Sequence, residues 1–596
     1  QNGHVRNSRV VTEYSPSAVL TWDWDINKDM KLTTTVFGRY GMYKSTRLNY
    51  NNADNPHPDY WKNLPSSYFY VWGDDPLYSA YRTESAANNW KQAYDSWQNP
   101  INQQINWNQL YYANSQVSKN GADALYFIQA KHSDNLMFNM ASTLSAKVTK
   151  RSTLVGGLVL GSNSNRHYQT MDDLLGASFF HNINTYALGT YPADDPRVQY
   201  DLNTAGPNNL GSLVYEGDKF GYDYKIEVMK GLLWTSYTAE MGRFQTMISG
   251  KLGQTNMRRH GYMRNGMAAN NSEGNSRIAR FGEGGAKGSI NFDAGKGHVF
   301  KIGVGYEWRP PMANTAFIAP EICNDYVLNL GDEHVFSSEF SYQYQNAWMH
   351  ANVNAYYSRL DHVTEWQNFY NDDSNSFTYL SMTGIEKEYY GIEAGLDFKV
   401  ASFLNFKALG TISDAKNINN ANVNYMLSKS AEVKKDYAYI KDMRESGTPL
   451  TIGSLALDFH KSGWFVNLNA NWYDRIYLSY SPSYRYKSSL KNRDMLFNDE
   501  PLPGSVDQAK GHGGWMVDGS IGKSIRLKHG SLNFNLMVTN ILNNRKIVSG
   551  GYEQSRSDYT LNKENEAKDR VYKFSKNPKK YYVFGTNGMF QVSYRF

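Results

Sequence analysis

The chain has 596 residues, a mean hydropathy of −0.62 and a formal net charge of +6 at pH 7. No apolar run reaches the roughly 18 residues that a transmembrane helix needs, so helical membrane proteins are excluded, and no basic block points to nucleic acid as a partner. Aromatic residues are unusually frequent at 15%, with 46 Tyr and 14 Trp. These two side chains concentrate at membrane–water interfaces, and a β-barrel spans a membrane without long apolar runs.

Segments in which apolar and polar residues alternate come in eight pairs, each pair joined by a tight polar turn. In the first segment, Leu20, Trp22 and Trp24 share one side of an extended chain and Thr21 and Asp23 share the other. The pairs cover residues 18–26 and 30–44, 136–148 and 153–160, 222–240 and 244–252, 277–292 and 299–308, 335–345 and 348–370, 389–400 and 403–412, 450–459 and 464–477, and 515–525 and 531–540.

The last ten residues form one more strand of this design, with Phe590, Val592, Tyr594 and Phe596 on one side. Long irregular stretches separate the pairs, and we expect them to be extracellular loops opposite short periplasmic turns. They cover residues 45–135, 161–221, 414–448, 478–514 and 541–586. A soluble β-sandwich would bury the alternating face against a second sheet, whereas these polar faces suit a water-filled lumen. The pattern predicts an all-β fold, a transmembrane antiparallel β-barrel that occupies residues 1–596.

Eight pairs and a single strand give about 17 strands, whereas single-chain bacterial barrels have an even number. Large plugged transporters have about 22 strands, which predicts about five further strands before Gln1. The chain opens without the pattern of a signal peptide, which agrees with a missing beginning. The alternative is a strand count that is wrong by one and a smaller, complete barrel.

Two short helices are predicted within the first long loop. One runs from Thr83 to Trp97 behind a Ser or Thr cap, and the other from Gln103 to Asn114. Their aromatic residues either pack the loop onto the barrel rim or line a vestibule and stack on a ligand. The candidate ligand-binding residues are Trp90, Trp97, Trp107, Tyr111 and Tyr112.

No catalytic or metal-binding pattern is found. Gly522-Lys523-Ser524 resembles the end of a phosphate-binding loop, but Val517 replaces the first glycine and the segment alternates as a strand. The 13 His include no His-Glu-x-x-His pair, and Cys323, the only cysteine, cannot form an internal disulfide. We therefore expect neither an enzyme nor a resident metal or cofactor.

A small basic cluster, Arg258, Arg259, His260 and Arg264, is expected in a loop after the strand 244–252. It is interpreted either as solvated loop charge or as a contact for lipopolysaccharide or an acidic substrate.

The carboxyl-terminal run Phe534 to Asn544, the segment Gly550 to Arg556 and the closing strand resemble TonB-dependent outer-membrane receptors. The resemblance implies a 22-stranded barrel around an amino-terminal plug, with substrate bound from outside. It also implies a TonB box on which the inner-membrane complex pulls. No segment before Ala18 is long enough to be a plug, so either plug and TonB box precede Gln1 in the full protein or the protein is not an active transporter. A surface lipoprotein lid, as in SusC-like glycan transporters, is a further partner to consider.

These observations predict TonB-dependent uptake of a large nutrient, such as a chelated metal, an oligosaccharide or a peptide, across a Gram-negative outer membrane. Outer-membrane lipid and lipopolysaccharide would surround the barrel. The alternative is a passive porin, or a barrel that assembles or secretes proteins without TonB.

Overall fold

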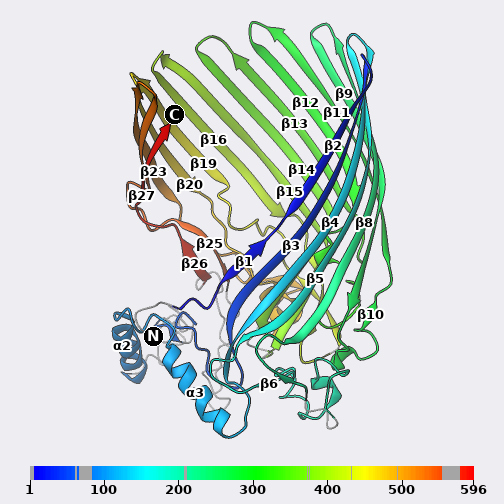
Figure 1. The fold of residues 1–596 in the computed structure, drawn as a ribbon, viewed down its shortest axis with the longest axis vertical. Coiled ribbons are helices and arrows are strands. Elements are labelled where there is room, and N and C mark those ends of the chain that lie inside the picture. Colours follow the sequence, from blue (N-terminus) through cyan, green and yellow to red (C-terminus); the bar gives the residue numbers. More distant parts are fainter. Residues whose placement is uncertain are drawn as a thin grey trace.

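The computed structural model describes residues 6–60, 63–65, 84–206, 211–371, 374, 376–430, 432–492, 494–553 and 578–596. Within these ranges, no helix is both long enough and apolar enough to cross a membrane. The helices α2 (Glu84–Trp97) and α3 (Trp107–Lys119) lie beyond one end of a large curved sheet (Figure 1).

Seventeen long strands follow one another around this sheet, each pairing antiparallel with the next. They are β2 (Ser17–Asn27), β3 (Met30–Tyr50), β4 (Tyr126–Thr149), β5 (Ser152–Asp173), β8 (Lys219–Met241), β9 (Phe244–Gly261), β11 (Ala279–Gly295), β12 (His298–Arg309), β13 (Glu333–Gln345), β14 (Met349–Asn371), β15 (Ser376–Ala401), β16 (Leu404–Asn417), β19 (Thr451–Lys461), β20 (Trp464–Asp474), β23 (Gly514–Leu527), β24 (Gly530–Thr539) and β27 (Asn587–Arg595). The predicted antiparallel barrel wall of about 17 strands is confirmed.

The first strand of the wall is interrupted by a proline. The short strand β1 (Val11–Tyr14) pairs with β3 in the same register as β2, so the two form one line on either side of Pro16. Pro16 has no N–H to donate, but its carbonyl accepts from the Tyr40 N–H at 3.1 Å. A proline is tolerated here because, in the described part of the chain, this strand has a partner on one side only.

The wall is not closed within the described residues. The last strand, β27, pairs with β24 and not with β1 or β2, and Figure 1 shows the sheet as an incomplete cylinder. Unpaired strand edges within a bilayer are costly because lipid offers their backbone groups no hydrogen bonds.

Eight tight turns join the strand pairs at one end of the wall, as predicted from the sequence. In the turn between β19 and β20, Ser462 and Gly463 both have positive φ, 53° and 79°. Two such residues make the type I′ turn that matches the twist of a hairpin. A Cβ on Gly463 would lie 2.4 Å from the Ser524 carbonyl oxygen, so glycine is required there.

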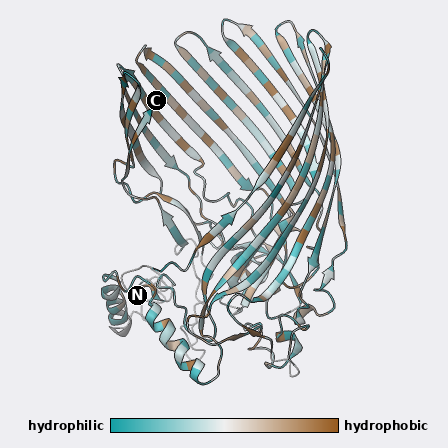
Figure 2. Ribbon diagram, viewed as in Figure 1, coloured by the Kyte–Doolittle hydropathy of each residue, from teal (hydrophilic) through white to brown (hydrophobic). Residues whose placement is uncertain are grey.

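One face of the wall is apolar and exposed. Directly paired residues carry this face from strand to strand, in the order Ile290, Ile302, Phe340, Ala355, Ile392 and Ile412. Ile302 is 59% exposed and Ile412 is 66% exposed. Figure 2 shows the resulting alternation of hydrophobic and hydrophilic residues along the strands. This outer face suits contact with lipid.

The opposite face carries ion pairs between strands. Lys301, next to Ile302, lies 2.6 Å from Glu339, and further bridges join Lys230 to Glu283 and Lys251 to Glu307 at 2.8 and 2.6 Å. Charged groups at these positions need water or a partner, so the inner face suits an aqueous lumen. The predicted polar interior is confirmed.

The expected loops 45–135, 161–221 and 414–448 were too long. β4, β5 and β15 have 24, 22 and 26 residues, whereas a transmembrane strand needs about 9–11. The third stretch contains a hairpin, β17 (Ala421–Leu427) and β18 (Val433–Ala438), in which β17 pairs with the outer part of β15. Beyond the lipid the apolar alternation ends, but the backbone hydrogen bonds between strands continue. A prediction from the side-chain pattern alone therefore makes these strands too short.

Leu468 and Asn469 in β20 test the assignment of the two faces. Leu468 is 43% exposed on the outer face, and Asn469 pairs with Asp518 of β23 on the inner face. Leu468→Lys is expected to cost about 2–4 kcal/mol because it places an ammonium in hydrocarbon. Asn469→Lys, facing a carboxylate in water, is expected to change stability by less than about 1 kcal/mol. Urea unfolding from lipid vesicles measures both, and equal losses would contradict the assignment.

Candidate ligand-binding site

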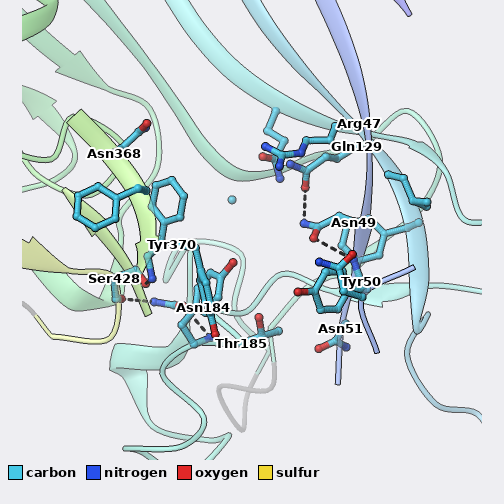
Figure 3. Close-up of a pocket in the computed structure, with 18 of the residues that line it drawn as sticks. Arg47, Asn49, Tyr50, Asn51, Gln129, Asn184, Thr185, Asn368, Tyr370 and Ser428 are labelled. Atoms are coloured by element: carbon cyan, nitrogen blue, oxygen red, sulfur yellow. Dashed lines mark hydrogen bonds between the residues drawn. The ribbon is translucent and has the colours of Figure 1, made fainter. Parts of the chain in front are cut away.

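The segments at the end opposite the tight turns enclose a cavity of about 2490 Å³. This volume exceeds the roughly 300–1,000 Å³ of pockets for drug-sized ligands. Its walls come from the outer ends of β3, β4, β14 and β15 and from the segments between strands (Figure 3).

One wall carries two amide side chains. Asn49 of β3 donates from Nδ2 to the Gln129 Oε1 of β4 at 2.9 Å, and its Oδ1 accepts from the Tyr50 N–H at 2.9 Å. Arg47, two residues earlier on β3, lies on the same wall (Figure 3). These hydrogen bonds fix the orientation of the Asn49 amide.

The facing wall belongs to β14. Residues 366–370 all line the cavity, and among them Trp366, Asn368 and Tyr370 follow the two-residue steps of one strand face. Asn368 and Tyr370 are exposed, while the Trp366 Nε1–H donates to the Ile318 carbonyl at 3.0 Å. The Tyr370 and Tyr186 rings have centroids 6.0 Å apart. This wall therefore offers an amide between two aromatic rings.

A buried hydrogen bond joins two distant segments between these walls. The Asn184 Nδ2 donates to the Ser428 carbonyl at 2.6 Å, and the Asn184 Oδ1 accepts from the Tyr186 N–H at 3.2 Å (Figure 3). Asn184 is only 3% exposed. The connection from β5 to β8 is thus tied to the segment that follows β17.

The segment 310–332 between β12 and β13 folds into the barrel bore, and we call it the floor loop. Phe317 and Ile318 are fully buried, and Glu321 and Ile322 line the cavity. The Glu321 carboxylate accepts from the Tyr379 hydroxyl of β15 at 2.7 Å and lies 3.6 Å from Lys131 of β4. Because β4 and β15 are far apart in the sheet order, these contacts place the loop across the bore.

Arg259 anchors the floor loop. Its guanidinium donates to the Pro320 carbonyl at 2.8 Å, the Ser272 carbonyl at 2.8 Å and the Asn324 Oδ1 at 2.5 Å. Burial lowers the pKa of Arg259 to about 10, so the group remains charged at neutral pH.

The prediction that a basic cluster lies in a loop is therefore wrong in part. Arg258, Arg259 and His260 belong to β9, and Arg259 is only 2% exposed, while Arg264 lies beyond the strand. Since the strand continues past residue 252, Arg259 points to buried carbonyl groups and away from any external anion.

The charges that line the cavity balance in the described residues. The basic residues are Arg9, Arg47, Lys131, Lys429 and Lys579, and the acidic residues are Asp54, Asp59, Asp123, Glu321 and Glu553. Burial lowers the pKa of His57, which also lines the cavity, so this imidazole is neutral at pH 7. In the described ranges, no three His, Cys, Asp or Glu side chains are grouped as metal ligands.

Most of these carboxylates have a partner of their own. Asp59 lies 2.7 Å from the Lys579 ammonium, and Asp123 lies 2.6 Å from the His181 Nδ1. Glu553 forms a two-pronged pair with Arg485 at 2.7 and 2.9 Å, and both side chains are at most 1% exposed. The acidic groups thus stabilise the walls and leave little free negative charge.

The helices predicted from the sequence are confirmed, but the second one is shifted at both ends and runs to Lys119 instead of Asn114. The helix predicted from Thr83 to Trp97 is α2. The second, α3, begins at Trp107 and not at Gln103, because the Asn106 side chain caps it by accepting from the Gln109 N–H at 3.2 Å.

The five aromatic candidates lie on α2 and α3. Trp107 is buried beside Leu48 and Leu175, and the Arg6 guanidinium lies 4.8 Å from its ring centroid and donates to the Tyr111 hydroxyl at 2.6 Å. Tyr112 is 62% exposed. The interpretation as rim packing describes Trp107 well.

On α2, Trp90 stacks on Tyr94 with centroids 5.1 Å apart, and the Trp97 Nε1–H donates to the Asn63 carbonyl at 3.2 Å. As far as the structure describes the cavity, none of the five aromatic candidates lines it. A ligand contact for them stays a prediction.

The cavity residues were not identified from the sequence. One signal was present, because Trp366, Asn368 and Tyr370 continue the two-residue period of β14 beyond the lipid-facing part. Asn184 and Ser428 carry no such signal, since they come from irregular segments that only the fold brings together.

No protein-family model and no curated protein matches the sequence. Solved structures do match the fold. The copper transporter OprC has a TM-score of 0.54 at 10% identity, over 98% of this chain and 65% of that one. The unliganded ferric citrate transporter FecA has a TM-score of 0.54 at 8% identity, over 99% and 62%. The ferric-catecholate import receptor Fiu from E. coli K12, in its closed form, has a TM-score of 0.52 at 11% identity, over 99% and 65%.

This chain spans less than two thirds of the length of these proteins. At such low identity the likeness concerns the fold. It shows that the strands of this chain are arranged as in the barrels of these transporters and this import receptor.

Arg258 and Arg259 allow a matched test of the floor-loop anchor. Arg259→Met leaves three buried acceptors without their donor, each costing about 1–3 kcal/mol. We expect much faster hydrogen exchange of the backbone amides of residues 316–327. Arg258→Met removes a half-buried ion pair with Glu227, worth about 1 kcal/mol, and should leave that exchange unchanged. Equal protection in both variants would show that Arg259 does not hold the loop.

Proposed function

We propose that this chain is the barrel of an energy-coupled outer-membrane transporter that imports a large nutrient into a Gram-negative cell. The observation that carries the proposal is a wide barrel wall, apolar outside and polar inside, whose outer end encloses a cavity of about 2490 Å³. The ligand would bind there from the medium. Passage would need no covalent chemistry, so the protein acts by binding and release and not as an enzyme.

The floor loop favours the interpretation as a receptor and argues against the interpretation as an open pore. A passive porin needs a continuous aqueous path, whereas here Glu321 bridges Tyr379 and Lys131 across the bore beneath the cavity. A binding site with a loop across the bore fits capture followed by gated passage. OprC, FecA and Fiu are described as transporters or import receptors, which agrees with this role.

The unclosed wall is the evidence for our proposal that the complete protein has further strands and a plug. Neither β2 nor β27 has a second partner in the described ranges, and the barrel lumen of such a wide wall must be filled. About five strands would close a wall of about 22. We propose that they precede Gln1 together with the plug.

The partners follow from this role. Lipid and lipopolysaccharide would cover the apolar face, and the TonB complex would act on a region before the plug. A surface lipoprotein could cover the cavity. Each of these partners is a proposal.

Conductance and uptake together test the transport mechanism. The full-length protein, purified and inserted in planar bilayers, is expected to show no steady conductance, and growth on its nutrient should require both this protein and TonB. A stable open-pore conductance, or growth that persists without TonB, would favour the passive porin and overturn the proposal.

A further inference from the structure

We infer that the cavity at the outer end binds a neutral, polyhydroxylated ligand, that is, an oligosaccharide. This inference rests on the proposed function and names the substrate class of that site. It comes from the charge, the hydrogen-bonding groups and the aromatic rings of the walls described above.

The charge balance argues against an anionic ligand. Five basic and five acidic side chains line the described part of the cavity, and with Arg485, the buried partner of Glu553, the formal charge is only +1. A site for an iron chelate rich in carboxylates or phenolates would concentrate positive charge, because a cleft of one sign attracts a ligand of the other. Here the Lys579 ammonium is held by Asp59, and Lys131 lies beside Glu321.

The uncharged polar groups match hydroxyls. Nine Asn and Gln side chains line the cavity. An amide presents a donor and an acceptor side by side, and a sugar hydroxyl is likewise donor and acceptor at once. Asn49 and Gln129 on one wall and Asn368 on the other face the same space (Figure 3).

The aromatic rings supply the second element of sugar recognition. A pyranose ring has an apolar face of C–H groups that packs against a flat aromatic surface, and its edge carries hydroxyls. On β14, two amides and two rings, Gln367, Asn368, Phe369 and Tyr370, line the cavity within four residues, while the Trp366 ring packs against the buried core of the floor loop. An extended row of amides and rings suits a chain of repeating units better than a compact chelate.

Peptides are the closest competitor, because amides also pair with peptide bonds. A peptide's hydrogen bonds come from its backbone, which an exposed strand edge would satisfy better than side-chain amides. Figure 3 shows side chains presented to the cavity from both walls. The structure therefore favours the glycan, and the experiment includes the peptide.

The test is binding of the full-length protein in detergent to an array of neutral and acidic oligosaccharides that includes maltoheptaose, cellohexaose and mannohexaose. Ferric citrate, ferric enterobactin and a capped uncharged octapeptide complete the set. We expect measurable binding only among the neutral glycans. Binding of an iron chelate or of the peptide, or no binding to any neutral glycan, would overturn the inference.

Variants then place the bound glycan in the cavity. Tyr370→Ala and Asn368→Ala are each expected to weaken binding about tenfold or more, whereas Tyr370→Phe keeps the ring and should bind within about threefold of the unchanged protein. Tyr215→Ala is the control, an exposed tyrosine outside the cavity lining. Equal losses in Tyr370→Ala and Tyr215→Ala, or none in the cavity variants, would contradict this placement.

The two proposals fail separately. A TonB-requiring transporter that binds a chelate would retain the proposed function and lose the inference. An open pore that binds glycans would retain the inference and overturn the proposed function.

Discussion

The structure depends on one constraint, that no backbone N–H or C=O inside a bilayer can remain without a hydrogen bond. Strands satisfy it only by pairing with neighbours, so the sheet must curve and continue around a lumen. Side chains then divide by position, with Ile302 and Leu468 toward lipid and Lys301 and Asn469 toward water. Among the described residues, the same constraint makes the edges of β2 and β27, each with a partner on one side, the least complete part of the wall.

Beyond the lipid, water can hydrogen-bond to backbone groups, so side-chain contacts determine how the segments between strands fold. The long hairpins continue as a ladder, but their connections fold inward. Arg259 holds the floor loop at the Pro320 carbonyl and the Asn324 amide oxygen and ties it to the Ser272 carbonyl, and Arg485 and Glu553 pair in full burial between two outer segments. Burying such groups is costly unless each is fully partnered, so these contacts fix one arrangement of the walls. The cavity, with its fixed amides and rings, results from that arrangement.

The sequence predicted the wall far better than the site. Alternation in segments such as β20 and β24 identified all seventeen strands, because only every second residue meets lipid. It began β4 and β15 too late and ended β5 too early, since the apolar alternation weakens where a strand leaves the lipid. Aromatics on α2 and α3 stood out by composition, whereas Asn184 and Ser428 are 244 positions apart and meet only through the fold. Polar residues scattered over several segments give no local signal.

The most direct test of the two-faced wall is cysteine scanning of residues 454–458 in β19, with the protein in lipid vesicles. Cys323, the single cysteine of these 596 residues, is buried, so each thiol introduced into this chain reports on its own position. The account predicts that a water-soluble maleimide labels positions 454, 456 and 458, and that positions 455 and 457 are protected and instead quenched by lipid nitroxides. Uniform labelling along the strand, or labelling of 455 and 457 alone, would contradict it.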